Sequence, residues 1–474
     1  MNLDSLFYPK SVAVIGASDN LGGGKVPYFQ IQQMNGFTGA LYPVNPRRAE
    51  VGGVKAYASI DELPGPVDFA LVAAPVEQSM DIVKAAVRKG IKFIHFFTSG
   101  FGEMGNLQLE KDLVREARKG HLRIVGPNCI GVQCFESKLS FRLLKDQRDP
   151  GAIAFLGQSG GITSNFVAMA TTRGIWLNKV VSYGNQIDLR LEDYLEYLAD
   201  DDKIRLVACY VEDIKDASKF LKTLRRATAK KPVIILKGGK TELGSKAAAS
   251  HTGAMASNYT IWAAAVRQHG GLLVDDFEQM MYLAMLGTAN KFPRGRRVGF
   301  LGAGGGVSVL FSDLAVASGV ELPELSARTQ RMIGEKIMGV NTSTTNPVDL
   351  GASGFDLNVM LHTMKALNED DAIDVIVPYF SVEYIMHAEM FLNVKNSADT
   401  ILQMAEQIKK PVIPVLSCFL ENDFEAERVR ISTFNALRKA GFPVYATIQD
   451  ALYVIETYFE WAKKRVRKGA QDAT

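Results

Sequence analysis

The sequence lacks the signals that mark secreted, membrane-spanning or nucleic-acid-binding proteins. Its four cysteines, Cys129, Cys134, Cys209 and Cys418, form no CxxC pair and no zinc-ligand spacing, which fits a reducing compartment. The N-terminus shows no signal peptide, and no apolar run reaches the roughly 18 residues that a spanning helix needs. The 54 lysines and arginines are interspersed with 51 acidic residues. We therefore expect a cytoplasmic protein with no membrane or nucleic-acid partner and no metal ligands of its own.

Glycine is the residue that the sequence has in excess. There are 42 glycines in 474 residues, about 9% against a usual ~7%. Three apolar runs each end in a glycine-rich turn that leads into helix-compatible sequence, and their anchoring glycines are 141 and 145 residues apart. This spacing is the size of one α/β domain and indicates three similar units in tandem. The three segments are VAVIGASDNLGGG (12–24), IAFLGQSGGI (153–162) and VGFLGAGGGVSV (298–309), anchored at Gly16, Gly157 and Gly302.

Each unit alternates strand-like runs with helical stretches. In the first unit the runs are SVAVIG, ALYPVNP, DFALVAAP, FIHFFTSG and RIVGPN. Continuously apolar strands that alternate with helices indicate a parallel sheet covered on both faces. The sequence therefore predicts an α/β protein with three tandem doubly wound domains, and polar stretches at 143–151 and 290–297 set their limits. The predicted domains are residues 1–147, 148–292 and 293–474.

The glycine-rich turns suggest anion sites, because a strand that feeds a helix through glycine presents backbone N–H groups closely to a ligand. Close packing of strand against helix is the other explanation for each turn. The first turn does not keep the G-x-G-x-x-G spacing of dinucleotide-binding proteins. The acid expected at the end of the second strand is replaced by Asn45-Pro46-Arg47-Arg48. These arginines favour a phosphorylated ligand over NAD, and the residues alone leave NADP and coenzyme A open.

One of the six histidines, His251, lies in the small-residue stretch KGGKTELGSKAAASHTGAMAS. A neutral imidazole attacks phosphorus when an acceptor holds its other nitrogen. Glu212, at the end of the run RLVACYVE, is a candidate acceptor because the carboxyl ends of parallel strands face the binding crevice. A histidine that packs or caps in its loop, and a solvated acid at a loop start, are the alternatives.

The whole sequence resembles the NDP-forming acyl-CoA synthetases, the superfamily of succinyl-CoA synthetase, and within it the ADP-forming α chain. The resemblance runs from about residue 5 to residue 465. It implies a Rossmann-like CoA-binding domain followed by two flavodoxin-like CoA-ligase domains. The motifs that carry it are SVAVIGAS, YPVNP, GPNCIG, GQSGGI, SHTGA after a strand–K-x-G run, GAGGGVSVLFSD and TNPVDLGASG.

The resemblance also implies roles for particular residues. His251 would be the phosphorylated histidine and Glu212 its orienting acid. Two helix N-termini would bind the phosphoryl group, through Ser159, Gly160 and Gly161 and through Gly304, Gly305 and Gly306. Phe141, Arg142, Tyr183 and Asn185 are positional candidates for the acid substrate. The CoA site would comprise Gly16, Ala17, Ser18, Asn45, Pro46, Arg47, Ala74, Pro75, Ser99, Gly100, Phe101, Asn128 and Cys129, with Arg47 or Arg48 on a CoA phosphate.

The implied reaction is acid + CoA + ATP ⇌ acyl-CoA + ADP + phosphate, through a phosphohistidine and an acyl phosphate. No stretch resembles the ATP-grasp domains that load such a histidine. We therefore expect a separate ATP-grasp β subunit that handles ATP or ADP with Mg²⁺, in an α2β2-type hetero-oligomer. The other ligands would be phosphate, coenzyme A and a small carboxylic acid.

Two other functions compete with this hypothesis. A non-catalytic CoA-binding or acyl-CoA-binding scaffold or sensor would keep the fold, but it would need neither His251 nor Glu212. A nicotinamide oxidoreductase built on the first domain would leave the SHTGA motif without a purpose, and Arg47 and Arg48 stand where NAD binding needs an acid.

Overall fold

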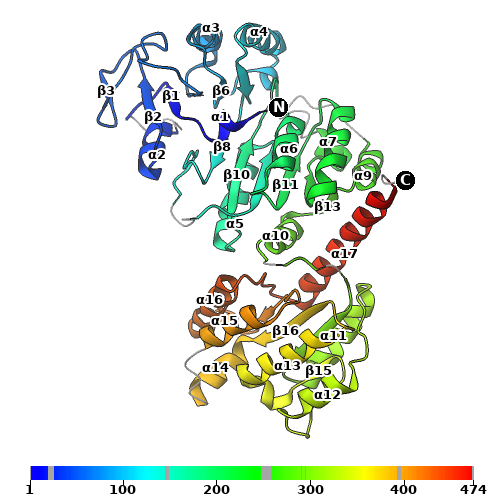
Figure 1. The fold of residues 1–474 in the computed structure, drawn as a ribbon. Helices are drawn as coiled ribbons and strands as arrows, with labels where there is room; N and C mark the ends of the chain where they lie inside the picture. The colour runs from blue at the N-terminus through cyan, green and yellow to red at the C-terminus, as the bar shows by residue number, and fades with distance from the viewer. Residues whose placement is uncertain are drawn as a thin grey trace. The chain divides into compact units, whose positions relative to one another are not determined.

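The structure is a computed structural model that describes residues 2–19, 26–144, 149–246, 258–289, 291–293, 295–391 and 397–471. It divides into two compact units, Met1–Met280 and Met281–Thr474. Strands and helices alternate through both units, so the predicted α/β class is confirmed (Figure 1). Within the described ranges, no helix is long and apolar enough to cross a membrane.

The first sheet of unit 1 is parallel, in the order β2-β1-β5-β6-β7. Because β2 lies on one side of β1 and the later strands on the other, the strand order reverses at β1, and open sheets of this kind bind ligands outside the carboxyl ends of the strands at that point. A two-stranded ribbon, β3 (Glu50–Val51) and β4 (Val54–Lys55), follows β2. The strands are β1 (Ser11–Ile15), β2 (Ala40–Val44), β5 (Phe69–Val72), β6 (Phe93–Phe96) and β7 (Arg123–Val125).

Amphipathic helices cover this sheet. In α3 (Ser79–Lys89) the buried side chains include Ile82, Val83 and Ala86, at the spacing that places them on one helix face. The other elements are α1 (Asp4–Phe7), α2 (Tyr28–Asn35), α4 (Leu107–Arg118) and the 3₁₀ turns η1 (Val76–Gln78) and η2 (Gly102–Met104).

The second sheet of unit 1 has the order β13-β12-β11-β9-β10-β8, and β8 alone runs antiparallel to its neighbour. β8 (Gly131–Cys134) precedes the predicted domain limit at residue 147, yet it pairs with this sheet. The strands are β9 (Ile153–Gly157), β10 (Leu177–Ser182), β11 (Leu206–Val211), β12 (Val233–Lys237) and β13 (Leu272–Val274). The helices are α5 (Gly160–Thr172), α6 (Leu191–Asp200), α7 (Ala217–Lys230) and α9 (Tyr259–Gln268), and α10 (Phe277–Leu286) begins in unit 1 and ends in unit 2.

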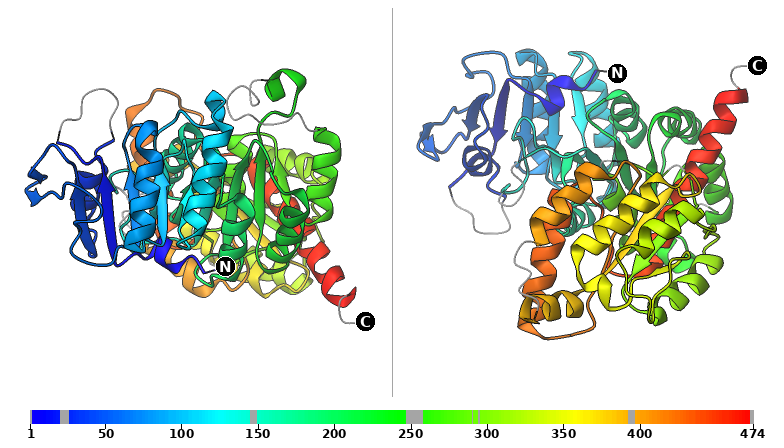
Figure 2. Two further views of the ribbon diagram at one scale, coloured as in Figure 1. Left: turned by 90° about the horizontal axis from the view of Figure 1, so that it is seen from above. Right: turned by 60° about the horizontal axis from the view of Figure 1, so that its bottom comes forward.

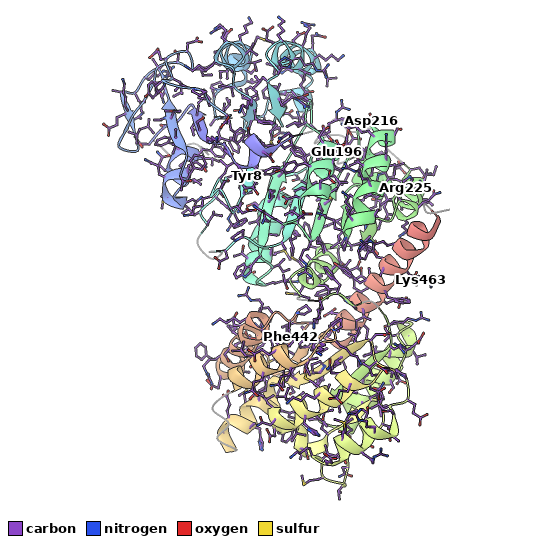
Figure 3. All side chains as sticks on the ribbon, viewed as in Figure 1. Tyr8, Glu196, Asp216, Arg225, Phe442 and Lys463 are labelled. Carbon is purple, nitrogen blue, oxygen red and sulfur yellow. The ribbon has the colours of Figure 1, made fainter. Side chains whose placement is uncertain are left out.

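Unit 2 holds a parallel sheet in the order β15-β14-β16-β17. Its hydrophobic core contains Leu301 of β14 and Ile376 of β16. Met364 and Leu367, on the helix that precedes β16, belong to the same core. Two further views show helices beside these strands (Figure 2), and side chains fill the space between them (Figure 3). The strands are β14 (Val298–Gly302), β15 (Val348–Asp349), β16 (Val375–Ser381) and β17 (Val415–Ser417). The helices are α11 (Gly305–Ala317), α12 (Ala327–Gly334), η3 (Gly351–Phe355), α13 (Leu357–Glu369), α14 (Val382–Phe391), α15 (Ser397–Gln407), α16 (Phe424–Lys439) and α17 (Ile448–Gln471).

Candidate active site

The predicted CoA residues nearest the N-terminus lie at the carboxyl ends of β1 and β2. Gly16 has a φ of +84°, and a Cβ there would lie 2.6 Å from the carbonyl oxygen of Ala73, so the turn needs glycine. The Asn45 amide donates to the carbonyl oxygen of Ala17 at 2.7 Å and accepts from the N–H of Arg47 at 2.9 Å. Asn45 therefore joins the two turns. Ser18, Pro46 and Arg48 belong to the same turns.

The next group follows β5 and β6. The Thr98 hydroxyl donates to the carbonyl oxygen of Ala74 at 2.6 Å, and Glu103 accepts from the N–H of Gly100 at 2.6 Å. Phe101 is fully buried and belongs to the hydrophobic core of the first sheet. Its side chain therefore stabilises the fold, and only its backbone is available to a ligand. Pro75 and Ser99 complete this group.

Asn128 and Cys129 follow β7. Asn128 has a positive φ of 56° and donates its N–H to the carbonyl oxygen of Thr98 at 3.2 Å. Burial raises the pKa of the Cys129 thiol, which is therefore not a reactive thiolate. The buried His95 ring lies 2.8 Å from the carbonyl oxygen of Cys129, and burial lowers the pKa of His95 to about 4. His95 is a neutral structural support for this loop.

This loop lies against the predicted phosphate turn of the second sheet. A Cβ on Gly160 would lie 3.1 Å from Cγ2 of Ile130, and a Cβ on Gly184 would lie 2.1 Å from the carbonyl oxygen of Pro127. The N–H of Asn185 donates to that same carbonyl oxygen at 3.0 Å. The CoA-side loop, residues 126–130, and the start of α5 are therefore neighbours at the carboxyl ends of the strands.

The start of α5 has the form of an anion site. Ser159 caps the helix, with its hydroxyl accepting from the N–H of Ile162 at 3.4 Å. Gly160 and Gly161 form the first turn, and Gly161 borders open space. The N–H groups of a first helical turn have no partner within the helix, and the helix dipole favours an anion beside them.

Glu212 lies beside this turn, directly after β11. The N–H groups of Glu212 and Asp213 both donate to the Gln158 side-chain oxygen, at 2.8 and 2.9 Å. Burial, together with the hydrogen-bonded Glu212 carboxylate, raises the pKa of Tyr210. Lys237 donates from Nζ to the carbonyl oxygen of Glu212 at 2.8 Å. His251 lies outside the described residues.

In unit 2 the third glycine turn contacts an acid. Gly304 has a φ of +111°, and its N–H donates to Asp349 Oδ1 at 3.0 Å. The same oxygen accepts from the N–H of Gly351 at 2.9 Å. The Gly304 donor is therefore used by a carboxylate, while Gly305 and Gly306 form the exposed first turn of α11. A cavity of about 490 Å³ beside this turn is also lined by Phe355 and Tyr384, whose ring centroids are 4.8 Å apart.

The four positional candidates for the acid do not share one environment. The hydroxyl of the fully buried Tyr183 donates to the carbonyl oxygen of Tyr210 at 3.1 Å. Asn185 donates to Glu103 at 2.6 Å and to Glu110 at 2.8 Å, so its amide joins the two sheets of unit 1. Phe141 and Arg142 instead follow β8 beside α2, where Asn35 donates to the carbonyl oxygen of Arg142 at 2.9 Å.

Several residues of the site were not found from the sequence. Gln158 and Lys237 hold Glu212 in place, and Asp349 holds the third glycine turn. Gln158 directly precedes Ser159, and Lys237 is the lysine of the strand–K-x-G run, so both lay within quoted motifs. Their contacts come from distant parts of the chain, which a motif alone does not reveal.

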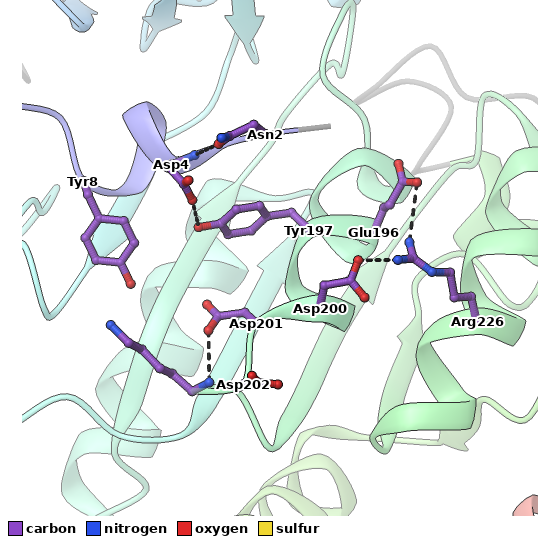
Figure 4. A pocket seen from close by; sticks show the side chains of 10 residues that line it. Asn2, Asp4, Tyr8, Glu196, Tyr197, Asp200, Asp201, Asp202 and Arg226 are labelled. Atoms are coloured by element: carbon purple, nitrogen blue, oxygen red, sulfur yellow. Dashed lines mark hydrogen bonds and ion pairs between the residues drawn. The ribbon is translucent and has the colours of Figure 1, made fainter.

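A separate cavity of about 710 Å³ lies near the amino ends of the strands of the second sheet (Figure 4). Most of its acids are already paired. Asp200 pairs with Arg226, and Asp201 lies 2.7 Å from the buried Lys179. The hydroxyl of Tyr197 donates to Asp4 at 2.8 Å, which ties α1 to α6. The contacts of this acidic cluster therefore stabilise the fold, on the edge of the sheet opposite the candidate active site.

Comparisons with known families match both sheets of unit 1. Residues 10–134 match the CoA binding domain, and residues 150–286 match the succinyl-CoA ligase like flavodoxin domain. These ranges contain the predicted CoA residues and the residues around Glu212, respectively.

Whole-chain relatives are similar along nearly the full length. The α subunit of ADP-forming acetate–CoA ligase II of Pyrococcus furiosus is 33% identical, over 97% of this chain and 98% of its own. The ADP-forming acetate–CoA ligase of Methanocaldococcus jannaschii is 33% identical over 73% of this chain, which spans about half (49%) of that relative's length.

A solved structure has the same fold. The dinucleotide forming acetyl-coenzyme A synthetase 1 of Ca. Korarchaeum cryptofilum, in complex with phosphate and ADP, matches with a TM-score of 0.84 and 26% identity over 99% of both chains. The Rossmann-like and flavodoxin-like domains expected from the sequence agree with these matches. The chain belongs to the ADP-forming acyl-CoA synthetase family of acid–CoA ligases, as a chain of the α-subunit type.

Proposed function

We propose that this chain is the α subunit that carries the acid and CoA chemistry of an ADP-forming acyl-CoA synthetase, through a phosphohistidine at His251. One observation carries the proposal. The CoA-side loop 126–130, the start of α5 and the backbone of Glu212 meet at the carboxyl ends of the strands of unit 1. A binding scaffold needs no acid beside an anion-binding turn, so this convergence favours the enzyme over a sensor.

Each group then has a task in the reaction. The Glu212 carboxylate accepts a hydrogen bond from the His251 ring and stabilises its positive charge, while the other ring nitrogen bonds to phosphorus. The N–H groups at Gly160 and Gly161 bind the phosphoryl oxygens in unit 1, and those at Gly305 and Gly306 offer a second phosphate site in unit 2. A carboxylate oxygen of the acid displaces the histidine at phosphorus and forms an acyl phosphate. The CoA thiol then attacks the carbonyl carbon, releases phosphate and gives its proton to solvent.

The CoA site and the domain limits belong to the same proposal. CoA would lie at the turns after β1, β2, β5, β6 and β7, with Arg47 or Arg48 on a phosphate. The domains would be residues 1–147, 148–292 and 293–474. The match of residues 10–134 to a CoA binding domain supports the first of these assignments.

A partner would supply the nucleotide chemistry. We infer an ATP-grasp β subunit with ATP or ADP and Mg²⁺, in an α2β2-type assembly in the cytoplasm. The chain spans 98% of the Pyrococcus relative, whose name as an α subunit implies a partner subunit, and this supports a partner for the present chain. A small carboxylic acid would bind beside the glycine turns.

Labelling with [γ-³²P]ATP tests the proposal. The chain, incubated with its β subunit and Mg²⁺, should take up acid-labile label, and His251→Ala should abolish it. His269→Ala is the matched control, because His269 lies at the end of α9 with Nδ1 2.7 Å from the carbonyl oxygen of Ala265. Equal label on His251→Ala and wild type, or no label on either, would refute the phosphohistidine.

A further inference from the structure

Lys237, the last residue of β12, and Lys240, three residues later, contact α9, which follows His251 in the sequence. Lys237 Nζ lies 5.8 Å from the ring centroid of Trp262, and Lys240 Nζ lies 5.7 Å from that of Tyr259. Both rings are on α9, one turn apart, and stack with centroids 6.2 Å apart. A cation within about 6 Å of a ring centroid is attracted by the ring face. Residues 237–240, which precede His251, are therefore held against residues 259–262, which follow it.

Lys237 also contacts Glu212. Its side chain is only 6% exposed, and Nζ donates to the carbonyl oxygens of Glu212 and Gly238. Burial lowers the pKa of Lys237, and the nearby Asp213 and Glu212 oppose that shift. One ammonium group thus connects the backbone of Glu212, the first residue after β12 and the aromatic face of α9.

Lys240 also bonds to residues at the end of β13. Its Nζ donates to the Asp275 carboxylate at 2.9 Å and to the carbonyl oxygens of Asp275 and Val274 at 3.1 and 3.3 Å. Val274 is the last residue of β13. Lys237 and Lys240 therefore lie beside α9 and beside the carboxyl ends of β11, β12 and β13.

We propose that Lys237, Lys240, Tyr259 and Trp262 form a cation–π clasp that holds the described residues on either side of His251, 237–240 and 259–262, beside Glu212, and that Lys237 is a positioning residue for transfer from the phosphohistidine. The inference rests on the proposed roles of His251 and Glu212. Fixing Glu212 and the two flanks of His251 relative to one another keeps the proposed acceptor in one place for the transfer step. A lysine performs this task because a single cation satisfies two carbonyl oxygens and an aromatic face together.

A matched pair of variants tests the clasp in the full chain with its β subunit. Lys237→Met removes the ammonium group. Lys231→Met is the control, because Lys231 is 7% exposed, also donates to two carbonyl oxygens, at 2.8 and 2.7 Å, has a pKa likewise lowered by burial, and precedes β12 at the far edge of the sheet. Both variants are first compared in their free energy of unfolding and in their affinity for CoA.

The readout is the rate at which ³²P-labelled chain loses its label to CoA plus acid. The acid is whichever of acetate, 4-hydroxybutyrate and ferulate discharges the wild type fastest. We expect Lys237→Met to slow discharge about 10- to 100-fold, with the KM for CoA within about twofold, because misplacement by about 1 Å has effects of this size. Lys231→Met should discharge within about twofold of wild type.

Equal discharge by the two lysine variants would overturn the clasp while leaving the phosphohistidine intact. A wild-type chain that takes up no label, or keeps it against all three acids, would instead contradict the proposed function.

Trp262→Leu gives a second measure of the clasp that does not require Lys237→Met to fold. As a single substitution, Trp262→Leu should slow discharge. Lys237→Arg should restore part of the discharge rate that is lost in Lys237→Met. Combining Lys237→Met with Trp262→Leu should slow discharge no more than the slower single variant. If the double variant slows discharge by the product of the two single effects, the two residues act independently and the clasp is refuted.

Discussion

Single side chains hold the site by joining distant backbones. Asn185 donates to both Glu103 and Glu110, Asn45 joins the turns after β1 and β2, and Gln158 accepts from two successive N–H groups at Glu212 and Asp213. These hydrogen bonds are part-buried, so losing one would cost less than the about 1–3 kcal/mol of a fully buried unsatisfied group. Neutral amides therefore connect the turns that form the site.

His95 links stability to pH. Its pKa falls from 6.5 to about 4 on folding, because the ring is buried. Between these values the unfolded chain binds a proton that the native chain does not, so stability falls as pH falls. We expect the free energy of unfolding of wild type, relative to His95→Gln, to drop by about 2 kcal/mol from pH 7 to pH 5. Urea titrations of both proteins measure the difference, and parallel pH profiles would contradict a neutral buried His95.

At the scale of elements, the close approach of two loops brings the CoA-side loop to the second sheet. Gly184 follows β10 with a φ of +50°, and a Cβ there would lie 2.1 and 2.6 Å from the carbonyl oxygens of Pro127 and Asn128. The next residues continue this contact, since the N–H groups of Ile187 and Leu189 donate to the carbonyl oxygens of Gly126 and Ile124 at 3.1 Å each. The segment after β10 thus extends the edge of the first sheet.

Gly184→Ala should disrupt this junction. A Cβ would lie 2.1 Å from a backbone oxygen in a conformation that favours glycine, so we expect the free energy of unfolding to fall by at least about 2 kcal/mol. Gly161→Ala is the control, because nothing lies within 4 Å of its Cβ position and alanine favours the helix by roughly 0.5–1 kcal/mol. Denaturant titration measures both, and equal stabilities would show that the junction tolerates a side chain.

The buried strands β1, β9 and β14 were predictable because each is a short, almost wholly apolar run that ends at a glycine. β8, β13 and β15 were missed. They have only two to four residues, and β8 contains a glycine and a glutamine. Such short strands form by pairing with the edge of a longer strand. Their positions therefore depend on the tertiary fold and not on the local sequence.

The candidate site was predictable at its backbone and less so at its side chains. The turns at Gly16 and Gly160 follow from strand, glycine and helix in succession. Phe101 was expected to line the CoA site, but its side chain packs in the core. Asp349, which accepts the Gly304 N–H, lies on a strand about 45 residues later in the chain. No local sequence pattern therefore indicates this hydrogen bond.

At the scale of the whole molecule, each unit has its own buried core. Leu113 belongs to the core of the first sheet in unit 1, and Met364 to the core of unit 2, and both are fully buried. Units with separate cores unfold separately unless their interface is large.

Thermal unfolding should therefore show separable transitions. Met364→Ala removes buried volume worth about 2–5 kcal/mol and should lower one transition, whereas Leu113→Ala should lower another. Calorimetry with CoA provides the assignment, because the proposed CoA site lies in unit 1 and the ligand should raise only the transition that Leu113→Ala lowers. A single transition that both variants shift equally would show one cooperative fold.

The carboxylate of Asp349 makes the two glycine-turn helices unequal. Ser159 caps α5 with a neutral hydroxyl, whereas α11 begins beside a negative charge that already accepts the Gly304 N–H. An anion at α11 meets repulsion as well as the helix dipole, so we expect it to be held more weakly there than at α5. The acyl-CoA-forming direction of the reaction releases phosphate, and of the two proposed anion sites α11 would then bind the released phosphate more weakly.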